Sequence, residues 1–392
     1  MSALKVSTTI IVLAGVLFLG IGIGNGRITI GPDGLYRKSI QQSGDKLSYD
    51  GIDELYTDLK DGYDGQLDTK KLEDGLKEGL VKAAGDPYTE YLTEEENKEF
   101  NEQLSGSFEG IGAELGKEGE AIVIIAPLAG FPAEKAGMKA KDIISKIDGE
   151  TAFDLSTTEA VKKIRGPKGT SVKLDIIRDG KPLSFDIVRD QITTPSVKWE
   201  VNKDHIGVIT ISRFGEDTSS LTLQAAQELK AKNVRGVVLD MRGNPGGLLE
   251  SSVKLSSLWL PDGKTILQEK RDKKVVKTYK SVGGHILAGV PTVVLVDEGS
   301  ASASEITAGA LKDNGAATIV GTKTYGKGSV QELRDLSAGG VLKVTIARWY
   351  TPNGRNIDKE GIEPDQKVEI SEEDFAAKRD PQKDAALAKL LQ

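Results

Sequence analysis

The first pattern along the chain is an uncharged run at residues 6–24, which follows Lys5. As a helix, these 19 residues would extend about 28 Å, close to the thickness of the hydrocarbon core of a bilayer. No convincing cleavage site follows the run, so an uncleaved membrane anchor is favoured over a cleaved signal peptide. Either interpretation places the bulk of the chain outside the cytoplasm, as a single-pass membrane protein or as a secreted or periplasmic one.

The next stretch, residues 49–103, has apolar residues at helical spacing. They recur on two predicted helices, at Ile52, Leu55, Tyr56 and Leu59 and at Leu72, Leu76 and Leu80. From about residue 106 the pattern changes from helical spacing to short runs rich in β-branched residues, which predict strands. These strands are expected at residues 120–126, 142–147, 172–178 and 181–189, with a helix at 156–164. The pattern therefore predicts a β-rich module after a helical region.

From about residue 196, buried strands and helices alternate. Strands are expected at residues 206–211, 236–240 and 290–296, and helices at 222–232, 248–260 and 302–312. Such alternation predicts a largely parallel sheet with helices on its faces. The last segment, residues 372–392, is charged and is expected to be helical.

The composition excludes several kinds of chemistry. The chain has no cysteine, which excludes disulfides, thiolate metal sites and a thiol nucleophile. Its two histidines, His205 and His285, have no obvious carboxylate partner, and no paired metal-ligand spacing occurs, so neither a metal nor another cofactor is expected. The net charge of −7 comes from 52 basic and 59 acidic residues without a basic block. Nucleic-acid binding is therefore not expected.

The stronger candidates for catalytic residues lie in a window at residues 296–305, VDEGSASASE, where a buried strand leads into a helix. Such a turn can expose a nucleophile and direct backbone N–H groups at a reacting oxygen. The same letters also fit a simple capping box from Ser302 to Glu305. The pattern leaves Ser300, Ser302 and Ser304 open as nucleophile candidates.

Two further windows are rich in glycine. In GTKTYGKGS at residues 321–329, Lys327 lies between glycines, and a lysine held inward there would lose hydration and could act as a neutral base. A solvated turn lysine is the alternative, and Lys323 competes for the role. DMRGNPGG at residues 240–247 could turn amides toward a ligand or could be a plain strand-to-helix turn. It lacks the spacing of a phosphate-binding loop.

Together these windows resemble the C-terminal processing peptidases, also called tail-specific proteases. The resemblance rests on GSASASE at 299–305, LKDNGAATIVGTKTYGKGSVQ at 311–331, LDMRGNPGGLL at 239–249, RWYTPNGRNIDKEGIEPD at 348–365 and GDPYTEYL at 85–92. It implies a serine endopeptidase and an α/β multidomain fold, in which a crotonase-like α/β protease core carries a β-rich PDZ domain and helical N- and C-terminal segments. The implied divisions are a membrane anchor or signal segment (1–25), a linker and helical region (26–103), the PDZ domain (104–192), the Ser–Lys protease core (193–370) and a C-terminal helical tail (371–392).

The resemblance also implies roles for individual residues. Ser302 matches the family's nucleophile, Lys327 its general base, and Gln331 the glutamine that orients the lysine. The oxyanion hole would use the amides of Ala303 and Gly246, with Gly247 as the alternative to Gly246.

Other positions match the family less firmly. Gly110, Ile111 and Gly112 look like the carboxylate-binding loop of the PDZ domain, which would capture polypeptide substrates with apolar C-termini by β-augmentation. Arg165 is expected to couple that domain to the core, and Asp313 matches an additional aspartate of some members without a firm role. A homo-oligomer is plausible from the family. Two alternatives stay open: a catalytically inactive PDZ scaffold and a crotonase-like acyl-CoA enzyme.

Overall fold

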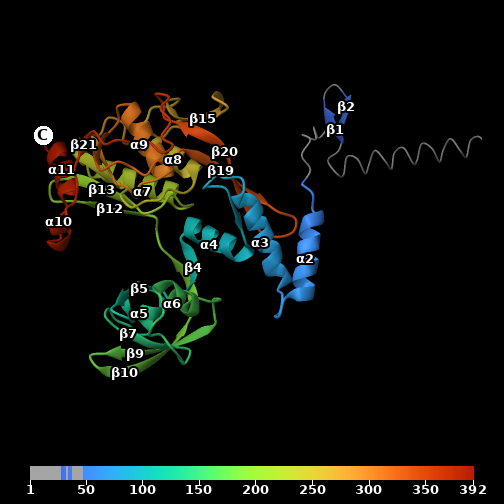
Figure 1. Cartoon of the computed structure of the whole chain (residues 1–392). Helices are drawn as coiled ribbons and strands as arrows, with labels where there is room; N and C mark the ends of the chain where they lie inside the picture. Colours follow the sequence, from blue (N-terminus) through green and yellow to red (C-terminus); the bar gives the residue numbers. More distant parts are fainter. Residues whose placement is uncertain (1–27, 32–33, 38–46) are drawn as a thin grey trace, which may run out of the picture. The chain divides into compact units, whose positions relative to one another are not determined.

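The computed structural model describes residues 28–31, 34–37 and 47–392, and the chain divides into two compact units, Met1–Leu72 and Glu73–Gln392 (Figure 1). The run at residues 6–24 lies outside the described residues. Among the helices that are described, none has the length and apolar character needed to cross a membrane.

The first unit holds the elements before residue 73. Strands β1 (Ile28–Gly31) and β2 (Gly34–Arg37) pair antiparallel, where the sequence predicted a linker without regular structure. The alternation of Ile28, Thr29 and Ile30 suits a strand, and it was too short to stand out. Helix α2 (Asp50–Gly62) follows, and α3 (Thr69–Lys82) begins in this unit and continues into the second. Both predicted helices are confirmed.

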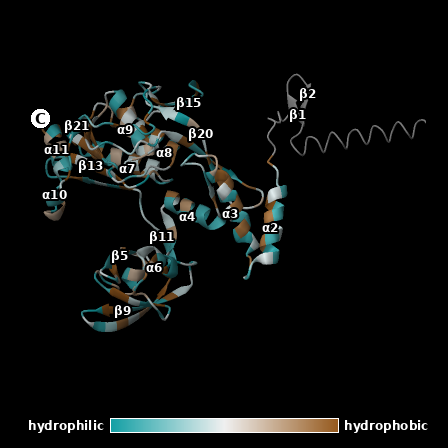
Figure 2. Ribbon diagram, viewed as in Figure 1, coloured by the Kyte–Doolittle hydropathy of each residue, from teal (hydrophilic) through white to brown (hydrophobic). Residues whose placement is uncertain are grey.

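The second unit contains the β-rich module. Its sheet has the strand order β10-β9-β7-β6-β5, with β8 paired to β7. The bounds are β5 (Ala113–Glu118), β6 (Ala121–Pro127), β7 (Ile143–Ile147), β8 (Glu150–Thr151), β9 (Ser171–Arg178) and β10 (Lys181–Val188), with helices α5 (Pro132–Lys135) and α6 (Thr157–Ile164). Val172, Leu174 and Ile176 alternate inward along β9, as period-2 patterning requires (Figure 2). The predicted strands are confirmed to within two residues.

The module is connected to the core by two neighbouring segments. Helix α4 (Glu94–Ser105) leads into β4 (Ser107–Gly110), and β11 (Asp190–Thr193) leads back out. The two strands pair antiparallel as a two-stranded ribbon, with Asp190 opposite Gly110 and Thr193 opposite Ser107. The chain therefore enters and leaves the module at one place.

The core is a six-stranded sheet with the order β12-β13-β14-β17-β18-β21. Its strands are β12 (Val197–Val201), β13 (Ile206–Ile211), β14 (Gly236–Asp240), β17 (Thr292–Val296), β18 (Thr318–Gly321) and β21 (Gln366–Lys367). All neighbours are parallel except β12 and β13. Helices α7 (Thr218–Ala231), α8 (Leu249–Ser256) and α9 (Ala303–Asp313) cover one face, and α11 (Pro381–Leu390) covers the other. Leu239 packs in the first of these layers and Val238 in the second, so the strands are apolar on both faces.

A second, antiparallel sheet was not predicted. It has the order β16-β15-β20-β19, with β3 also paired to β20. Its strands are β3 (Glu90–Leu92), β15 (Thr265–Arg271), β16 (Lys274–Lys280), β19 (Ser329–Asp335) and β20 (Val341–Tyr350). The charged tail forms α10 (Glu372–Ala376) and α11 rather than one helix, because Pro381 follows the cap residue Asp380 and starts a new helix.

Candidate active site

The three sequence windows meet at one edge of the core sheet. Strands β14, β17 and β18 are adjacent and parallel, so their carboxyl ends lie together. The loops at residues 241–248, 297–302 and 322–328 each follow one of these ends. Ligand sites of parallel sheets are built at this edge.

Ser302 lies at a strained turn between β17 and α9. Its backbone has φ 53° and ψ −112°, a region that non-glycine residues rarely occupy. A sharp strand-to-helix turn of this kind exposes the side chain that it carries. Ser302 is half-buried and lines a cavity.

The other two serines of this window are engaged elsewhere. Ser300 is fully buried, and its Oγ donates to the carbonyl of Met241 at 2.8 Å. Ser304 is also fully buried and donates to the carbonyl of Asn244 at 2.9 Å. Both hydroxyls hold the neighbouring loop in place, which leaves Ser302 as the serine of this window that faces the cavity.

Glu305 connects the serine turn to the lysine loop, a role that a capping box alone does not reveal. Its carboxylate is fully buried. Oε2 accepts from the backbone N–H groups of Ser302 at 2.8 Å and Lys327 at 2.9 Å. Oε1 accepts from Thr324 Oγ1 at 2.5 Å and from the Gly326 amide at 2.7 Å. Burial raises the pKa of Glu305, and the hydrogen bonds that it accepts oppose that change.

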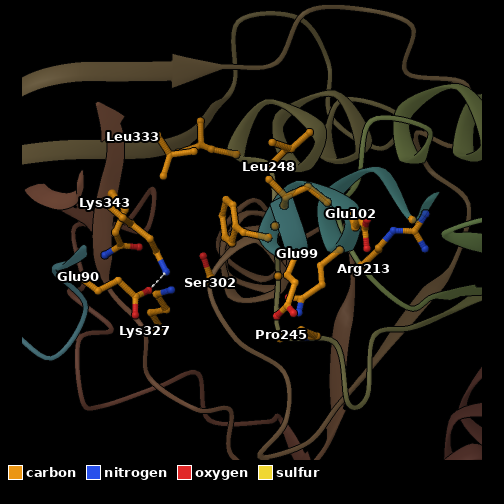
Figure 3. A pocket seen from close by; sticks show the side chains of 18 of the residues that line it. Glu90, Glu99, Glu102, Arg213, Pro245, Leu248, Ser302, Lys327, Leu333 and Lys343 are labelled. Atoms are coloured by element: carbon orange, nitrogen blue, oxygen red, sulfur yellow. Dashed lines mark hydrogen bonds and ion pairs between the residues drawn. The ribbon is translucent and has the colours of Figure 1, made fainter. Parts of the chain in front are cut away.

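Lys327 is drawn into the same cavity. Burial lowers the pKa of Lys327, and the positive charge of Lys343 lowers it further, while the carboxylates of Glu90 and Glu305 oppose the shift. Its Nζ lies 5.2 Å from the centre of the Tyr88 ring, and no carboxylate of the described residues is within ion-pair range of it. Lys327 and Ser302 line the same cavity, where Figure 3 shows Ser302 between Lys327 and Glu99, and no hydrogen bond joins the side chains of Ser302 and Lys327.

Two neighbours of Lys327 differ from it. Lys323 is half-exposed and forms an ion pair with Glu363 at 3.1 Å, so it is not a buried amine. Gln331 lines the cavity, where its Nε2 donates to Ser329 Oγ at 2.6 Å, and no hydrogen bond joins it to Lys327. The structure thus brings Gln331 near the lysine without the contact that the sequence predicted.

The glycine loop after β14 lies directly against the serine turn. A Cβ on Gly246 would come within 2.8 Å of Ser302 Cβ and 2.9 Å of the Ala303 amide nitrogen. The Gly246 N–H is already used, because it donates to Asn244 Oδ1 at 2.9 Å. The amides of Ala303 and Gly247 have no acceptor among the described residues. The free donors beside Ser302 are therefore those of Ala303 and Gly247.

Arg242 ties this loop to the C-terminal helix and carried no predicted role. Its guanidinium donates to both carboxylate oxygens of Asp240 and of Asp380, at 2.7–2.9 Å. It also donates to Gln382 Oε1 at 3.1 Å. Burial lowers the pKa of Arg242, but the hydrogen bonds to the two carboxylates outweigh burial and raise it well above its ordinary value.

The cavity has a volume of about 960 Å³ and extends from the core to the β-rich module. Ser302 and Lys327 line it on the core side, and Arg165 and Phe108 line it on the module side. Arg165 forms an ion pair with Glu102 at 3.1 Å and stacks on the Phe108 ring at 4.4 Å.

The remaining predicted residues lie away from the cavity. Ile111 is buried, and its carbonyl accepts from Ala133. Gly112 has φ 72° and lies so close to Phe131 that no side chain fits there. Asp313 accepts from the Asn353 amide at 2.9 Å, which supports the loop after β20. Gly110, Ile111, Gly112 and Asp313 are not among the residues that line the cavity.

This arrangement defines a class of protein. A serine on a strained strand-to-helix turn, facing a desolvated lysine and unpaired backbone amides, has the groups of a serine peptidase that uses lysine in place of histidine. The β-rich module beside the cavity adds a separate unit that could bind peptide.

Comparisons with known proteins agree with this class. Residues 205–368 match the model of peptidase family S41, and residues 123–178 match that of the PDZ domain. The chain is 39% identical to the carboxy-terminal processing protease CtpA of Bacillus subtilis over 82% of this chain and 69% of that protein. A CtpA-like serine protease of Staphylococcus haemolyticus is 40% identical over 81% of this chain and 64% of its own. The solved photosystem II D1 C-terminal processing protease superposes with a TM-score of 0.51 and 28% identity, over 82% of this chain and 87% of that one.

The chain therefore belongs to peptidase family S41, among the carboxy-terminal processing serine proteases that carry a PDZ domain. The predicted family, enzyme class and α/β multidomain fold are confirmed.

Proposed function

We propose that this serine endopeptidase cuts with Ser302 as its nucleophile and Lys327 as its general base. The observation that carries the proposal is that Lys327 is drawn out of water into the cavity of the strained Ser302, without a carboxylate of the described residues at its Nζ. A lysine in such surroundings releases its proton at a lower pH than a solvated lysine does. The neutral amine can then accept the proton of a hydroxyl group.

The reaction proceeds in two halves. Lys327 Nζ accepts the Ser302 proton as Oγ attacks the peptide carbonyl, and the amides of Ala303 and Gly247 donate to the oxyanion, because the Gly246 amide is bonded to Asn244. One such donor typically contributes about 3 kcal/mol. Lys327 then protonates the leaving amine as the C–N bond breaks. Water, deprotonated by Lys327, hydrolyses the acyl ester and regenerates Ser302. We assign Gln331 to orient the lysine once its side chain leaves Ser329.

We infer that the PDZ domain captures the C-terminal region of a polypeptide substrate. Strand β5 is at the edge of the PDZ sheet and α6 packs beside it, so an extended peptide could add to that edge. The loop at Gly110, Ile111 and Gly112 precedes this strand, where its amides could receive a terminal carboxylate. The relatives named as carboxy-terminal processing proteases support this assignment.

We also propose that the protein works outside the cytoplasm. The apolar run at residues 6–24 supports a single-pass membrane protein, or a secreted or periplasmic one after cleavage. Family membership favours proteolysis over the inactive PDZ scaffold and over an acyl-CoA enzyme.

The test compares wild type with Ser302→Ala and Lys327→Ala on an unfolded polypeptide that has a free apolar C-terminus. Both variants should lose cleavage, whereas Lys323→Ala, which changes a lysine in the same loop, should keep it. A serine-directed fluorophosphonate should add its mass to Ser302 in wild type. Cleavage by Ser302→Ala at the wild-type rate would show that another residue is the nucleophile.

A further inference from the structure

The PDZ domain and the protease core meet where the chain enters and leaves that domain. Ser105 and Gly106 form the entry segment, and Thr194 begins the exit segment. The Thr194 amide donates to the Gly106 carbonyl at 2.9 Å, and its Oγ1 reaches the same oxygen at 3.3 Å. The two segments are therefore bonded to each other, and we call residues 105–106 and 194 together the hinge.

Arg213, from the loop between β13 and α7, holds both segments. Its Nη2 donates to the Thr194 carbonyl at 2.7 Å and to the Ser105 carbonyl at 3.3 Å. The guanidinium also lies against Gly106, where a Cβ would overlap it. Only 15% of the Arg213 side chain is exposed, so these contacts are shielded from water. Figure 3 shows Arg213 beside α4, on the opposite side of Ser302 from Lys327.

The residue after Arg213 forms part of the support of the active site. The Phe214 amide donates to the Gly246 carbonyl at 2.8 Å, and the Leu248 amide donates to the Phe214 carbonyl at 2.7 Å. Gly247 lies so close to the Phe214 carbonyl that a side chain there would overlap it. Gly246 in turn contacts the Ser302 turn. Residues 213 and 214 thus lie between the PDZ hinge and the oxyanion loop.

We infer that Arg213 is a positioning residue that couples the placement of the PDZ domain to the oxyanion loop of the protease site. The coupling runs through contiguous short contacts: hinge carbonyls to Arg213, Phe214 to the glycine pair, and Gly246 to Ser302. Arg213 Nη2 also donates to Asp217 Oδ1 at 3.4 Å, at the N-cap of α7, which fixes the arginine to the core side of the hinge. The kinetic part of this inference rests on the proposed roles of Ser302 and the oxyanion loop.

The first test measures the hinge without using activity. The chain has no cysteine, so cysteines placed at the exposed Asp179 in the PDZ domain and Asp272 in the core accept spin labels at these two positions alone. Double electron–electron resonance on the Ser302→Ala protein should give a distance distribution that broadens when Arg213→Gln is added. Arg235→Gln, which removes the same charge from an exposed position away from the hinge, should leave the distribution unchanged.

The second test measures the oxyanion loop in the catalytically competent protein. With a short quenched peptide as substrate, Arg213→Gln should lower kcat about tenfold and change KM less than twofold, since a misplaced oxyanion donor acts on the transition state. Arg213→Lys, which keeps the positive charge and N–H donors on a single nitrogen, should recover part of the loss. If Arg213 had a purely structural role, Arg213→Gln would lower the amount of folded enzyme, and the folded fraction would keep the wild-type kcat and KM.

Each outcome decides the inference. An unchanged distance distribution in Arg213→Gln overturns the hinge clamp, and a broadened one with wild-type kcat overturns the link to the oxyanion loop. If Arg213→Gln does not fold, Gly106→Ala displaces the guanidinium from the opposite side and should give the same two changes. An inactive wild type would instead overturn the proposed catalytic roles and leave the distance test standing.

Discussion

Replacing Glu305 by glutamine removes one of two acceptor oxygens at a fully buried position. The carboxylate accepts four hydrogen bonds, two at each oxygen, from Ser302, Lys327, Thr324 and Gly326. A glutamine amide has one acceptor oxygen, and its NH₂ group must face one of the two pairs of donors. Turned toward Thr324, the NH₂ could donate to that hydroxyl, but the buried Gly326 N–H would still face a donor.

The smallest loss is therefore one buried N–H left without an acceptor, which costs about 1–3 kcal/mol. We expect the thermal midpoint of the Glu305→Gln core to fall by about 4–8 °C, taking the middle of that range. The opposite orientation would unpair the amides of Ser302 and Lys327 and displace the side chains of both residues. We expect kcat to fall at least tenfold because both orientations loosen the contact between the two loops.

The measurements are calorimetry and steady-state cleavage of a short quenched peptide. Glu298→Gln is the matched control, because Glu298 is exposed on the same turn and accepts one side-chain hydrogen bond, from Thr322 at 2.9 Å. It should change neither quantity appreciably. A Glu305→Gln enzyme with the wild-type midpoint and with kcat within twofold of wild type would refute the argument that both oxygens must accept.

Further predictions concern protonation and the C-terminal helix. Because burial lowers the pKa of Lys327, kcat/KM of wild type should rise with pH through that lowered pKa, which a pH–rate profile measures. Lys327→Met should be inactive but more stable by about 1 kcal/mol at neutral pH, since it removes a partly desolvated ammonium group; calorimetry checks this. The pKa of Lys327 is lower in the folded protein than in the unfolded chain, so between these two pKa values the unfolded chain binds more protons. The contribution of this lysine to the free energy of unfolding of wild type therefore rises with pH in that range. Lys327→Met should lack this contribution. Asp380→Asn should lower kcat several-fold, because Arg242 would lose the carboxylate that ties its loop, which also contains Gly246 and Gly247, to the start of α11. Asp374→Asn, which breaks the pair with Arg379, should not lower kcat, and steady-state cleavage checks both variants.

The parallel core could be predicted because its strands are continuous apolar runs. Residues 236–240 and 292–296 are buried on both faces, so each reads as a strand without any knowledge of its partner. Windows rich in glycine and serine follow these runs directly, so the loops proposed to be catalytic could also be located from the sequence. The antiparallel sheet gave no such signal. Strand β16 is exposed at six of its seven residues and has no buried apolar face, and β19 ends in the exposed charged residues Glu332, Arg334 and Asp335.

The pairing of strands that are far apart in the sequence could not be predicted either. Strand β3 pairs with β20, with Leu92 opposite Val341, and nothing local to either segment specifies the other. The same limit applies to the site. The capping pattern identified Glu305, but its bonds to Thr324, Gly326 and Lys327 come from a loop that folds back onto it. Likewise, the glycine pair was recognisable, whereas the use of the Gly246 amide by Asn244 depends on packing.

The strained backbone of Ser302 and the glycine at position 246 both belong to the place where the serine turn and the loop after β14 lie against each other. A non-glycine residue in the conformation of Ser302 costs about 1–3 kcal/mol, and the Glu305 carboxylate on its amide offsets part of that cost. On its other side the turn lies so close to residue 246 that a Cβ there would come within 2.8 Å of Ser302 Cβ. Glycine is therefore required at position 246 by the approach of the two loops, although the Gly246 amide itself is bonded to Asn244. Any side chain at 246 would move the Ser302 turn away from the amide of Gly247, the proposed oxyanion donor, without removing either group.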